Sequence, residues 1–440
     1  MKIFQMNFLV PLGPSRNTKK RFFSICLLAF FTQALSPQSN AFPKQKVIVI
    51  SLDGFPASYL DSPEWMQSFP NLERWRTGGN LWSVETVEPS VTYPAHVSMV
   101  TGKDPERHGI FSNSPLDPFD RKDQGWQWYS EDIQVPTLFD ACEFPHCKSL
   151  NLFWPVTVGE RGIFWNIPQI WRKKNAEDLK LLRSLSTSGL WKEVERNTGI
   201  SLSEESSDRD RFKAFEYLWR TKEPDLSFLY TTDIDSAHHS HGLFSEIAKA
   251  RILEWDNAFG KFLTDIKFKE RKDIQVILVS DHGFTKSTSQ CSPNIYLMNK
   301  GFLDPQKEEW KFYFKGNGGT GLLLAKSKEI WNTEIEIAFQ NDLASNCPGL
   351  AFQKNNYKLP NGFWVVLQLE AREGMVLSST KKGNLYAALS QPIYGHGFSP
   401  KVRSMRTILG YSGKRKEEWE TIRSVHTMVC EILNLNCENG

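Results

Sequence analysis

Three short apolar segments, each followed by an aspartate, constrain the possible folds of this chain more than any other feature. They are residues 46–52 before Asp53, residues 226–230 before Asp233 and Asp235, and residues 274–280 before Asp281. Short apolar runs without polar alternation are typical of parallel strands buried on both faces, and the first and third of these segments are also rich in β-branched residues. The carboxyl ends of parallel strands meet at one edge of a sheet, where such sheets bind ligands. The aspartates therefore predict a functional site at that edge.

Helical stretches separate these segments. Residues 209–220 and 244–267 read as helices, and the second carries apolar residues at three- and four-residue spacing. Alternating strands and helices predict an α/β layer fold with a mostly parallel sheet, in one domain over residues 42–435. Residues 301–388 contain short alternating runs with Gly and polar turns instead, so we expect an inserted or covering subdomain there.

The first 41 residues read as a secretory signal. They hold five Lys or Arg and no acid, and a basic triplet at 19–21 precedes an apolar run over 22–31 and small residues at 39 and 41. The run is short for a membrane span, which needs roughly 20 residues; an uncleaved anchor is the alternative. Without this leader the net charge of +3 becomes −2. A nearly neutral body argues against nonspecific binding to nucleic acid and gives no support to binding at a membrane surface; a membrane contact is expected only if the leader is not cleaved. We expect export to a periplasm, the cell surface or the medium.

Export also predicts disulfides. Loss of the leader removes Cys26 and leaves six cysteines, an even number in an oxidising compartment. The expected pairs are Cys142 with Cys147, Cys430 with Cys437 and, from what remains, Cys291 with Cys347. Six cysteines allow fifteen pairings, and buried free thiols are the alternative without export.

Acids and histidines follow the predicted strands in a pattern that suits metal binding. The candidates are Asp53, Asp235, His239, Asp281, His282 and His396. Asp235 and His239 are four residues apart, so a helical turn would place both on one face. Carboxylate and imidazole together suit zinc and related divalent ions. Residues 235–242 read DSAHHSHG, and chemistry alone leaves open which of these three histidines is the ligand.

A possible nucleophile precedes a predicted helix over residues 95–101. Thr92 lies two residues before Pro94. Helix N–H groups favour a bound anion, which would place a phosphate beside the hydroxyl. Thr before a helix is more often an N-cap, and this stretch alone favours the cap.

Several motifs together resemble the nucleotide pyrophosphatase/phosphodiesterase family of the alkaline phosphatase superfamily. In family order they are VISLDGF at 49–55, TYPAH at 92–96, TGK at 101–103, HGI at 108–110, Asn113, Trp154-Pro155, Pro168, DSAHH at 235–239, SDHG at 280–283 and HGF at 396–398. The resemblance implies an alkaline-phosphatase-like three-layer α/β/α sandwich with a smaller inserted subdomain. It also implies metal-dependent hydrolysis of phosphodiester or pyrophosphate bonds, with nucleotides or similar small molecules as substrates.

The resemblance further implies two zinc sites. One is formed by Asp235, His239 and His396, and the other by Asp53, Asp281, His282 and the Thr92 hydroxyl. His239 is selected because it alone keeps the family's spacing between Asp235 and Gly242. Thr92, activated by metal, would attack phosphorus and form a phosphothreonine intermediate. Asn113 falls at the family's phosphate-binding asparagine and, with a backbone N–H near Thr92, would stabilise the developing charge.

The sequence departs from the family pattern near the expected substrate. Tyr93 stands where Phe is common, and Val-Thr follows Trp154-Pro155 in place of Gly-Ser. Tyr93, Trp154 or Trp171 would stack on a nucleobase or, equally, pack in the core. The alternatives to a diesterase are a phosphate monoesterase or phosphonate hydrolase of the same superfamily, and a secreted homologue that binds without catalysis.

Overall fold

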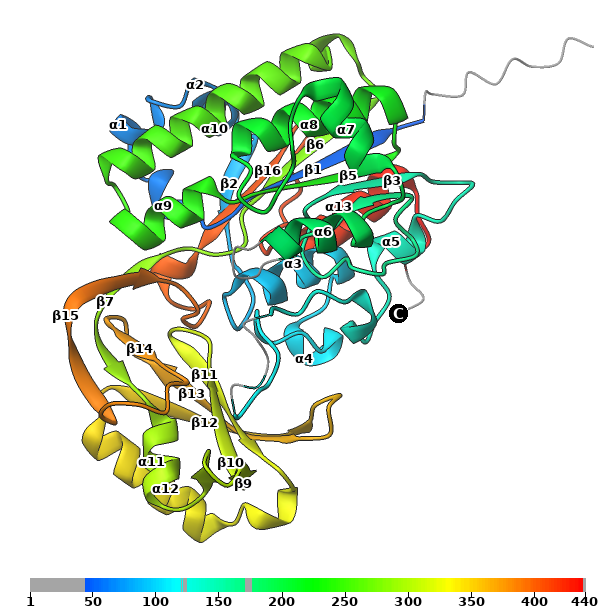
Figure 1. Ribbon diagram of the computed structural model, residues 1–440. Coiled ribbons are helices and arrows are strands. Elements are labelled where there is room, and N and C mark those ends of the chain that lie inside the picture. Colours follow the sequence, from blue (N-terminus) through cyan, green and yellow to red (C-terminus); the bar gives the residue numbers. More distant parts are fainter. Residues whose placement is uncertain (1–43, 120, 122–124, 171–175, 438–440) are drawn as a thin grey trace, which may run out of the picture. The chain divides into compact units, whose positions relative to one another are not determined.

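Strand β1 (Lys46–Leu52) lies at the centre of a seven-stranded sheet in the computed structural model, which describes residues 44–119, 121, 125–170 and 176–437 (Figure 1). The strand order is β2-β16-β6-β1-β5-β3-β4. The other six are β2 (Leu81–Val84), β3 (Ser149–Leu152), β4 (Trp165–Ile167), β5 (Leu226–Thr231), β6 (Ile274–Val279) and β16 (Thr407–Tyr411). The three segments expected from the sequence are thus β1, β5 and β6, and they are neighbours.

The sheet is mostly parallel, as expected. β1 pairs in parallel with β5 and β6, and β3 pairs in parallel with β5 and β4. Only β16 departs, pairing antiparallel with β6 and β2. Every residue of β5 is buried, and so is β1 from Val47 onward. This burial on both faces explains why these strands lack polar alternation.

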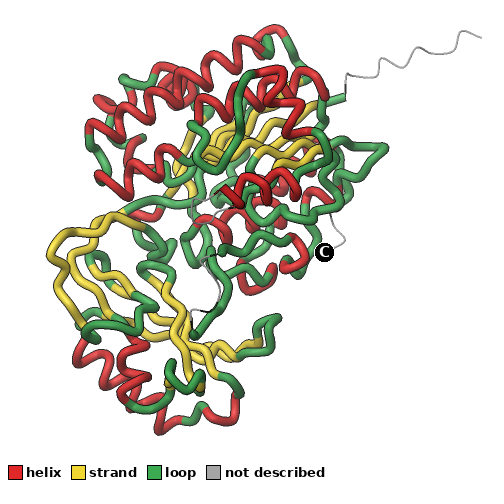
Figure 2. Tube along the Cα trace, in the orientation of Figure 1, coloured by secondary structure: helices red, strands yellow, loops and turns green. Residues whose placement is uncertain are grey.

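Helices cover both faces of the sheet (Figures 1 and 2). They are α1 (Pro63–Met66), α2 (Pro70–Thr77), α3 (Thr92–Thr101), α4 (Pro105–His108), α5 (Leu138–Ala141), α6 (Ala176–Leu185), α7 (Leu190–Thr198), α8 (Asp208–Lys222), α9 (Asp233–His241), α10 (Glu246–Asp265) and α13 (Ser424–Leu433). The helices α11 (Pro293–Asn299) and α12 (Thr333–Asn346) pack instead against strands that lie between β6 and β16 in the sequence. On one face α8 packs on β5 and against α10; on the other, α13 packs on β1 and against α3. The result is the expected three-layer α/β/α arrangement.

A second group of strands lies between β6 and β16 in the sequence. It comprises β7 (Thr285–Cys291), β8 (Leu303–Asp304), β9 (Glu309–Trp310), β10 (Phe312–Gly316), β11 (Thr320–Ala325), β12 (Leu350–Lys358), β13 (Trp364–Ala371), β14 (Met375–Leu377) and β15 (Tyr386–Gly395). These strands form sheets of four, three and two strands, with α11, α12 and a second hydrophobic cluster that includes Phe314 and Leu367. The departure from the main sheet begins at β7, earlier than the boundary at residue 301 that the sequence texture suggested.

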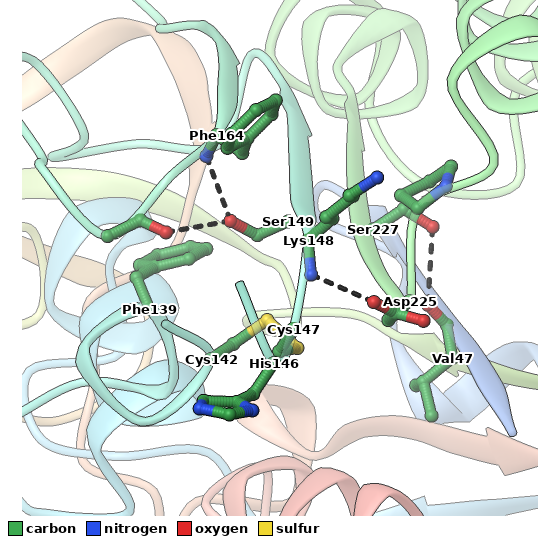
Figure 3. The surroundings of a disulfide bond; sticks show 12 residues. Val47, Phe139, Cys142, His146, Cys147, Lys148, Ser149, Phe164, Asp225 and Ser227 are labelled. Carbon is green, nitrogen blue, oxygen red and sulfur yellow. Dashed lines mark hydrogen bonds between the residues drawn. A yellow bond between two sulfur atoms is a disulfide. The ribbon is translucent and has the colours of Figure 1, made fainter. Parts of the chain in front are cut away.

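Three disulfides join the cysteine pairs named from the sequence. They are Cys142–Cys147, Cys291–Cys347 and Cys430–Cys437. Figure 3 shows the first, directly before β3. There the Lys148 N–H donates to Asp225 at 2.9 Å, which ties the start of β3 to the start of β5. The signal expected at residues 1–41 lies outside the described residues. Among the residues that the structure does describe, no helix is both long enough and apolar enough to cross a membrane.

Candidate active site

The carboxyl ends of the central strands bring together three aspartates. Asp53 directly follows β1, and Asp281 follows β6 after Ser280. Asp235 lies in the first turn of α9, which begins two residues after β5. Because β1 lies between β5 and β6, side chains more than 180 residues apart in the sequence meet at one edge. Asp53 and Asp281 are almost completely buried there.

The aspartates and histidines form two groups that share His282. Asp53, Asp281 and His282 form one, and Asp235, His282 and His396 form the other; within each, the ligand atoms lie within 4.8 Å of one another. The His282 Nε2 atom is 3.4 Å from Asp53 Oδ1 and 3.3 Å from Asp281 Oδ2. The first group contains the three protein side chains expected, besides Thr92, for the second metal.

His239 lies beside the second group. Its Nε2 atom is 3.5 Å from Asp235 Oδ1, and its ring centroid is 5.2 Å from that of His396. The rings of His282 and His396 are stacked with their centroids 3.6 Å apart, so the ring of the shared residue His282 lies directly against His396 of the second group. Asp235, His239 and His396, expected to form one site, are thus neighbours, with the His239 side chain 44% exposed.

All three histidines are oriented by backbone carbonyls. The Nδ1–H groups of His239, His282 and His396 donate at 2.9 to 3.1 Å. The acceptors are the carbonyl oxygens of Tyr394, Gly283 and Ser90. A carbonyl can only accept, so each Nδ1 carries the proton and each Nε2 keeps a lone pair. Fixing the tautomer in this way is a common feature of metal-binding histidines.

The electrostatics favour a bound cation. Burial raises the pKa of the Asp53 carboxyl well above its ordinary value, and the charges of Asp235 and Asp281 raise it further. Burial and His239 lower the pKa of His396 to about 3. Within the described part of the chain, four buried atoms of the site have no hydrogen-bond partner: Asp53 Oδ1, Asp235 Oδ1, Asp281 Oδ2 and His282 Nε2. Buried polar atoms are normally paired, and divalent cations would satisfy these oxygen and nitrogen donors together.

Thr92 opens helix α3 at the same place. It is the first helical residue, it is 4% exposed, and it lines a cavity with Asp53 and His396. The N-cap position belongs to Val91, whose side chain cannot cap. The interpretation of Thr92 as an N-cap, which the local sequence favoured, therefore does not describe this helix.

Asn113 is held by the backbone next to Thr92. Its Oδ1 atom accepts a hydrogen bond from the Tyr93 N–H at 2.8 Å, and its side chain lines the same cavity. Because the oxygen is engaged, the amide is oriented and its NH₂ group is the donor left for a ligand. The Tyr93 N–H, which lies nearest to Thr92 in the sequence, is therefore already used to orient Asn113.

Two further side chains, whose roles were not recognised from the sequence, form hydrogen bonds beside the candidate metal ligands and Thr92. The Tyr230 hydroxyl donates to Asp53 Oδ2. His96 donates from Nδ1 to the Thr92 carbonyl at 2.7 Å, and its Nε2 accepts from the Ser51 hydroxyl at 2.8 Å. Tyr230 is in β5 and His96 is one helical turn after Thr92, so ordinary strand and helix patterns conceal both roles.

The neighbour of His239 has a structural role. His238 is completely buried; its Nδ1 donates to the Gly54 carbonyl at 3.0 Å and its Nε2 accepts from the Tyr59 hydroxyl at 2.7 Å. Burial lowers its pKa to about 4. Both nitrogens are therefore engaged, which leaves none for a metal.

The cavity beside Thr92 has a volume of about 460 Å³. Besides the residues already described, its wall contains Trp126, Gln169, Thr232, Ser236 and Ser240. Tyr93 and Trp154, considered above for nucleobase stacking, are completely buried and absent from this wall. The Trp154 indole donates to the His96 carbonyl and packs on Phe228, as a core residue does. Trp171 lies outside the described residues.

Comparison with known proteins agrees with this architecture. The profile of the type I phosphodiesterase/nucleotide pyrophosphatase family matches residues 47–347. Ectonucleotide pyrophosphatase/phosphodiesterase family member 3 of Bos taurus is 24% identical over 434 residues, covering 91% of this chain and 44% of that protein. The venom phosphodiesterase CdcPDE of Crotalus durissus collilineatus is 24% identical over 423 residues, covering 90% and 45%. The chain thus spans less than half the length of these relatives.

A solved structure shares the fold. An inactive variant of murine ectonucleotide pyrophosphatase/phosphodiesterase 5, in complex with AMP, aligns with a TM-score of 0.60 and 19% sequence identity. The alignment covers 90% of this chain and 96% of that one. The family match extends over two thirds of the chain, including β1, α3, β5 and β6 with the residues that follow them. On these grounds, this chain belongs to the type I phosphodiesterase/nucleotide pyrophosphatase family.

Proposed function

We propose that this protein hydrolyses phosphodiester or pyrophosphate bonds of nucleotide-type substrates, with two divalent metal ions and Thr92 as the nucleophile. The observation that carries the proposal is the cavity that Thr92 shares with Asp53, Asp235, His239 and His396. Buried carboxylates and oriented imidazoles are suited to hold zinc, and threonine needs an activating metal to attack phosphorus at neutral pH. Family membership supports the same chemistry.

In the proposed reaction, each side chain has a separate task. Metal ions held by the two groups would lower the pKa of bound hydroxyl groups and offset the negative charge of the phosphate. The Thr92 hydroxyl gives up its proton to solvent, and its oxygen forms a bond to phosphorus while the bond to the leaving oxygen breaks; the leaving alcohol or phosphate takes a proton from water, and a phosphothreonine remains. Asn113 donates from its NH₂ group to a non-bridging oxygen, where charge develops. Water then attacks phosphorus and releases Thr92 for the next turnover.

The charge of the cavity favours a diester over a monoester. None of its described lining residues is Lys or Arg. A monoester dianion usually calls for such a cation beside the metals, whereas a diester presents a single negative charge. A nucleotide substituent suits the remaining wall, where Trp126 offers an aromatic surface. The runner-up, a phosphate monoesterase or phosphonate hydrolase of the same superfamily, would need a cation from elsewhere.

We further propose that the protein acts outside the cytoplasm. The relatives include proteins named as ectonucleotide pyrophosphatases and venom phosphodiesterases. Three disulfides close within the described residues, which suits an oxidising compartment.

A substrate comparison tests the proposal. Purified protein loaded with Zn²⁺ is assayed on bis-p-nitrophenyl phosphate and on p-nitrophenyl phosphate, before and after treatment with a chelator. We expect higher kcat/KM for the diester and loss of both activities after chelation, with recovery on adding metal. Equal or faster turnover of the monoester would refute the diesterase assignment. No turnover of either, together with tight metal binding, would favour a binding protein.

A further inference from the structure

Gln169 places an unpartnered amide oxygen on the wall of the active-site cavity. The residue is 1% exposed, lines the cavity, and its Oε1 atom has no hydrogen-bond partner among the residues that the structure describes. A buried carbonyl oxygen is normally paired, because leaving it unpaired loses the hydrogen bonds it made to water. An exception beside a candidate catalytic centre requires an explanation, and a ligand in the cavity can supply the missing donor.

The position of Gln169 in the fold suits ligand recognition. It follows β4 by two residues, at the carboxyl end of a parallel strand, where open α/β sheets bind ligands. The adjacent Ile170 N–H donates to the Glu204 carboxylate, which anchors the backbone at this point. The terminal amide torsion of glutamine is soft, so a small rotation turns Oε1 toward a donor without moving that backbone.

The neighbours of Gln169 indicate what kind of donor it meets. Trp126 lines the same cavity and provides an aromatic surface, while Thr92 and Asn113 define where phosphorus would be held. The substituent on phosphorus must therefore occupy the rest of the cavity. An aromatic surface together with an amide suits a nucleoside, which presents both a flat ring and hydrogen-bond donors.

We propose that Gln169 determines substrate specificity by accepting a hydrogen bond from the nucleoside part of the substrate. In AMP three groups have the required chemistry: the 6-amino group of adenine, the 2′-hydroxyl of ribose and its 3′-hydroxyl. A ligand that lacks the donor leaves Gln169 Oε1 without a hydrogen bond. Such a ligand should therefore bind more weakly than one that carries the donor. This inference rests on the proposed function, since it assumes that nucleotides occupy the cavity.

Binding of four nucleoside monophosphates tests the inference without catalysis. The Thr92→Ala variant, loaded with Zn²⁺, is titrated calorimetrically with AMP, IMP, 2′-deoxy-AMP and 3′-deoxy-AMP. IMP carries an oxygen in place of the 6-amino group, and the two deoxy compounds lack the 2′- or the 3′-hydroxyl. We expect one of these three analogues to bind about tenfold more weakly than AMP, as a lost hydrogen bond to a buried acceptor predicts. The weaker ligand identifies the donor as belonging to the base or to the ribose.

Substitutions at Gln169 then assign the discrimination to its oxygen. Gln169→Met has nearly the same shape without the acceptor, so the ratio of affinities should fall to within about twofold. Gln169→Glu retains an acceptor oxygen, and any effect of its charge cancels in the ratio, so discrimination should persist. Gln127→Met is the matched control, because Gln127 Oε1 is also buried and unpartnered but lines no part of this cavity. Thermal unfolding checks that each variant is folded.

Two results would overturn the inference. One is equal binding of all four ligands by the protein with Gln169 intact, and the other is discrimination that survives Gln169→Met. Failure of the proposed function is seen separately, as the absence of bis-p-nitrophenyl phosphate hydrolysis by the Zn²⁺-loaded protein with Thr92 intact. That substrate has no hydrogen-bond donor, so its turnover does not depend on the role inferred for Gln169.

Discussion

Replacing Tyr230 with Phe should weaken metal binding without disturbing the fold. The Tyr230 hydroxyl donates to Asp53 Oδ2, and both side chains are buried. Burial and the Asp53 charge raise the pKa of Tyr230 well above its ordinary value, so the hydroxyl keeps its proton and acts as a donor. Tyr230→Phe removes one oxygen and leaves the ring in place. Asp53 then loses the hydrogen bond to its Oδ2 atom, which orients the carboxylate so that Oδ1 can bind a metal ion.

The expected magnitude follows from that single bond. A hydrogen bond to a charged group contributes about 1.5–3 kcal/mol, and about 1.4 kcal/mol corresponds to a tenfold change in affinity. Loss of a group that orients a metal ligand typically costs about 10- to 100-fold in metal affinity or activity. We therefore expect the dissociation constant for Zn²⁺ at the Asp53 site to rise by about 10- to 100-fold.

Competition with a chromophoric chelator measures this change in the dissociation constant for Zn²⁺, and elemental analysis measures how much metal each variant holds. The matched control is Tyr59→Phe, which also deletes a buried hydroxyl but one bound to His238, which holds no metal in our assignment. Tyr59→Phe should leave Zn²⁺ affinity within about twofold of the unaltered protein, since it touches no ligand. If both variants behave alike, or Tyr230→Phe binds Zn²⁺ as tightly as the unaltered protein, the assignment of Tyr230 as a support for Asp53 is refuted.

Three further predictions concern the nucleophile, pH and a disulfide. Thr92→Ala should abolish hydrolysis of bis-p-nitrophenyl phosphate while retaining the unfolding temperature; activity within about tenfold would remove Thr92 from the mechanism. Burial and, to a lesser extent, the negative charge of Glu370 raise the pKa of Glu88 to about 7. The folded state therefore holds this proton more tightly, and stability should fall as pH rises from about 4.5 to 7. Glu88→Gln should flatten that dependence in unfolding curves recorded between these values; an unchanged slope would contradict it. Replacing Cys291 and Cys347 with Ser opens a loop with a sequence separation of 56. The chain-entropy relation predicts a loss of about 4 kcal/mol in denaturant unfolding, and a loss below about 1 kcal/mol would argue against it.

The sequence alone predicted the central strands and the site at their ends. Short apolar runs of 5 to 7 residues are locally distinctive, so β1, β5 and β6 are found where expected, to within a residue at each end. Parallel pairing then follows from the helices between them. The convergence of Asp53, Asp235 and Asp281 is a consequence of that pairing, which is why the strand pattern is sufficient to group these acids.

The roles of individual side chains depended on packing. His238 and His239 are adjacent and chemically identical, yet one directs both ring nitrogens to the core and the other keeps an Nε2 lone pair beside Asp235. Helical rotation by one residue separates the two, and only the surroundings of α9 show which faces the site. Trp154 illustrates the same limit, since its place in the core is set by Phe228 and the His96 carbonyl.

The sequence by itself determined which residue types follow which strands, and hence that acids and histidines suited to metal binding gather at one edge of the sheet. Tertiary structure decided the contents of the cavity. Trp126 and Gln169 lie in segments without periodic patterns, and their chemistry becomes visible only when both line one wall with Thr92. The physical reason is the separation of the interacting residues along the sequence. Strand and helix patterns reflect contacts between residues close in sequence, whereas residues far apart in sequence come together to form a cavity wall.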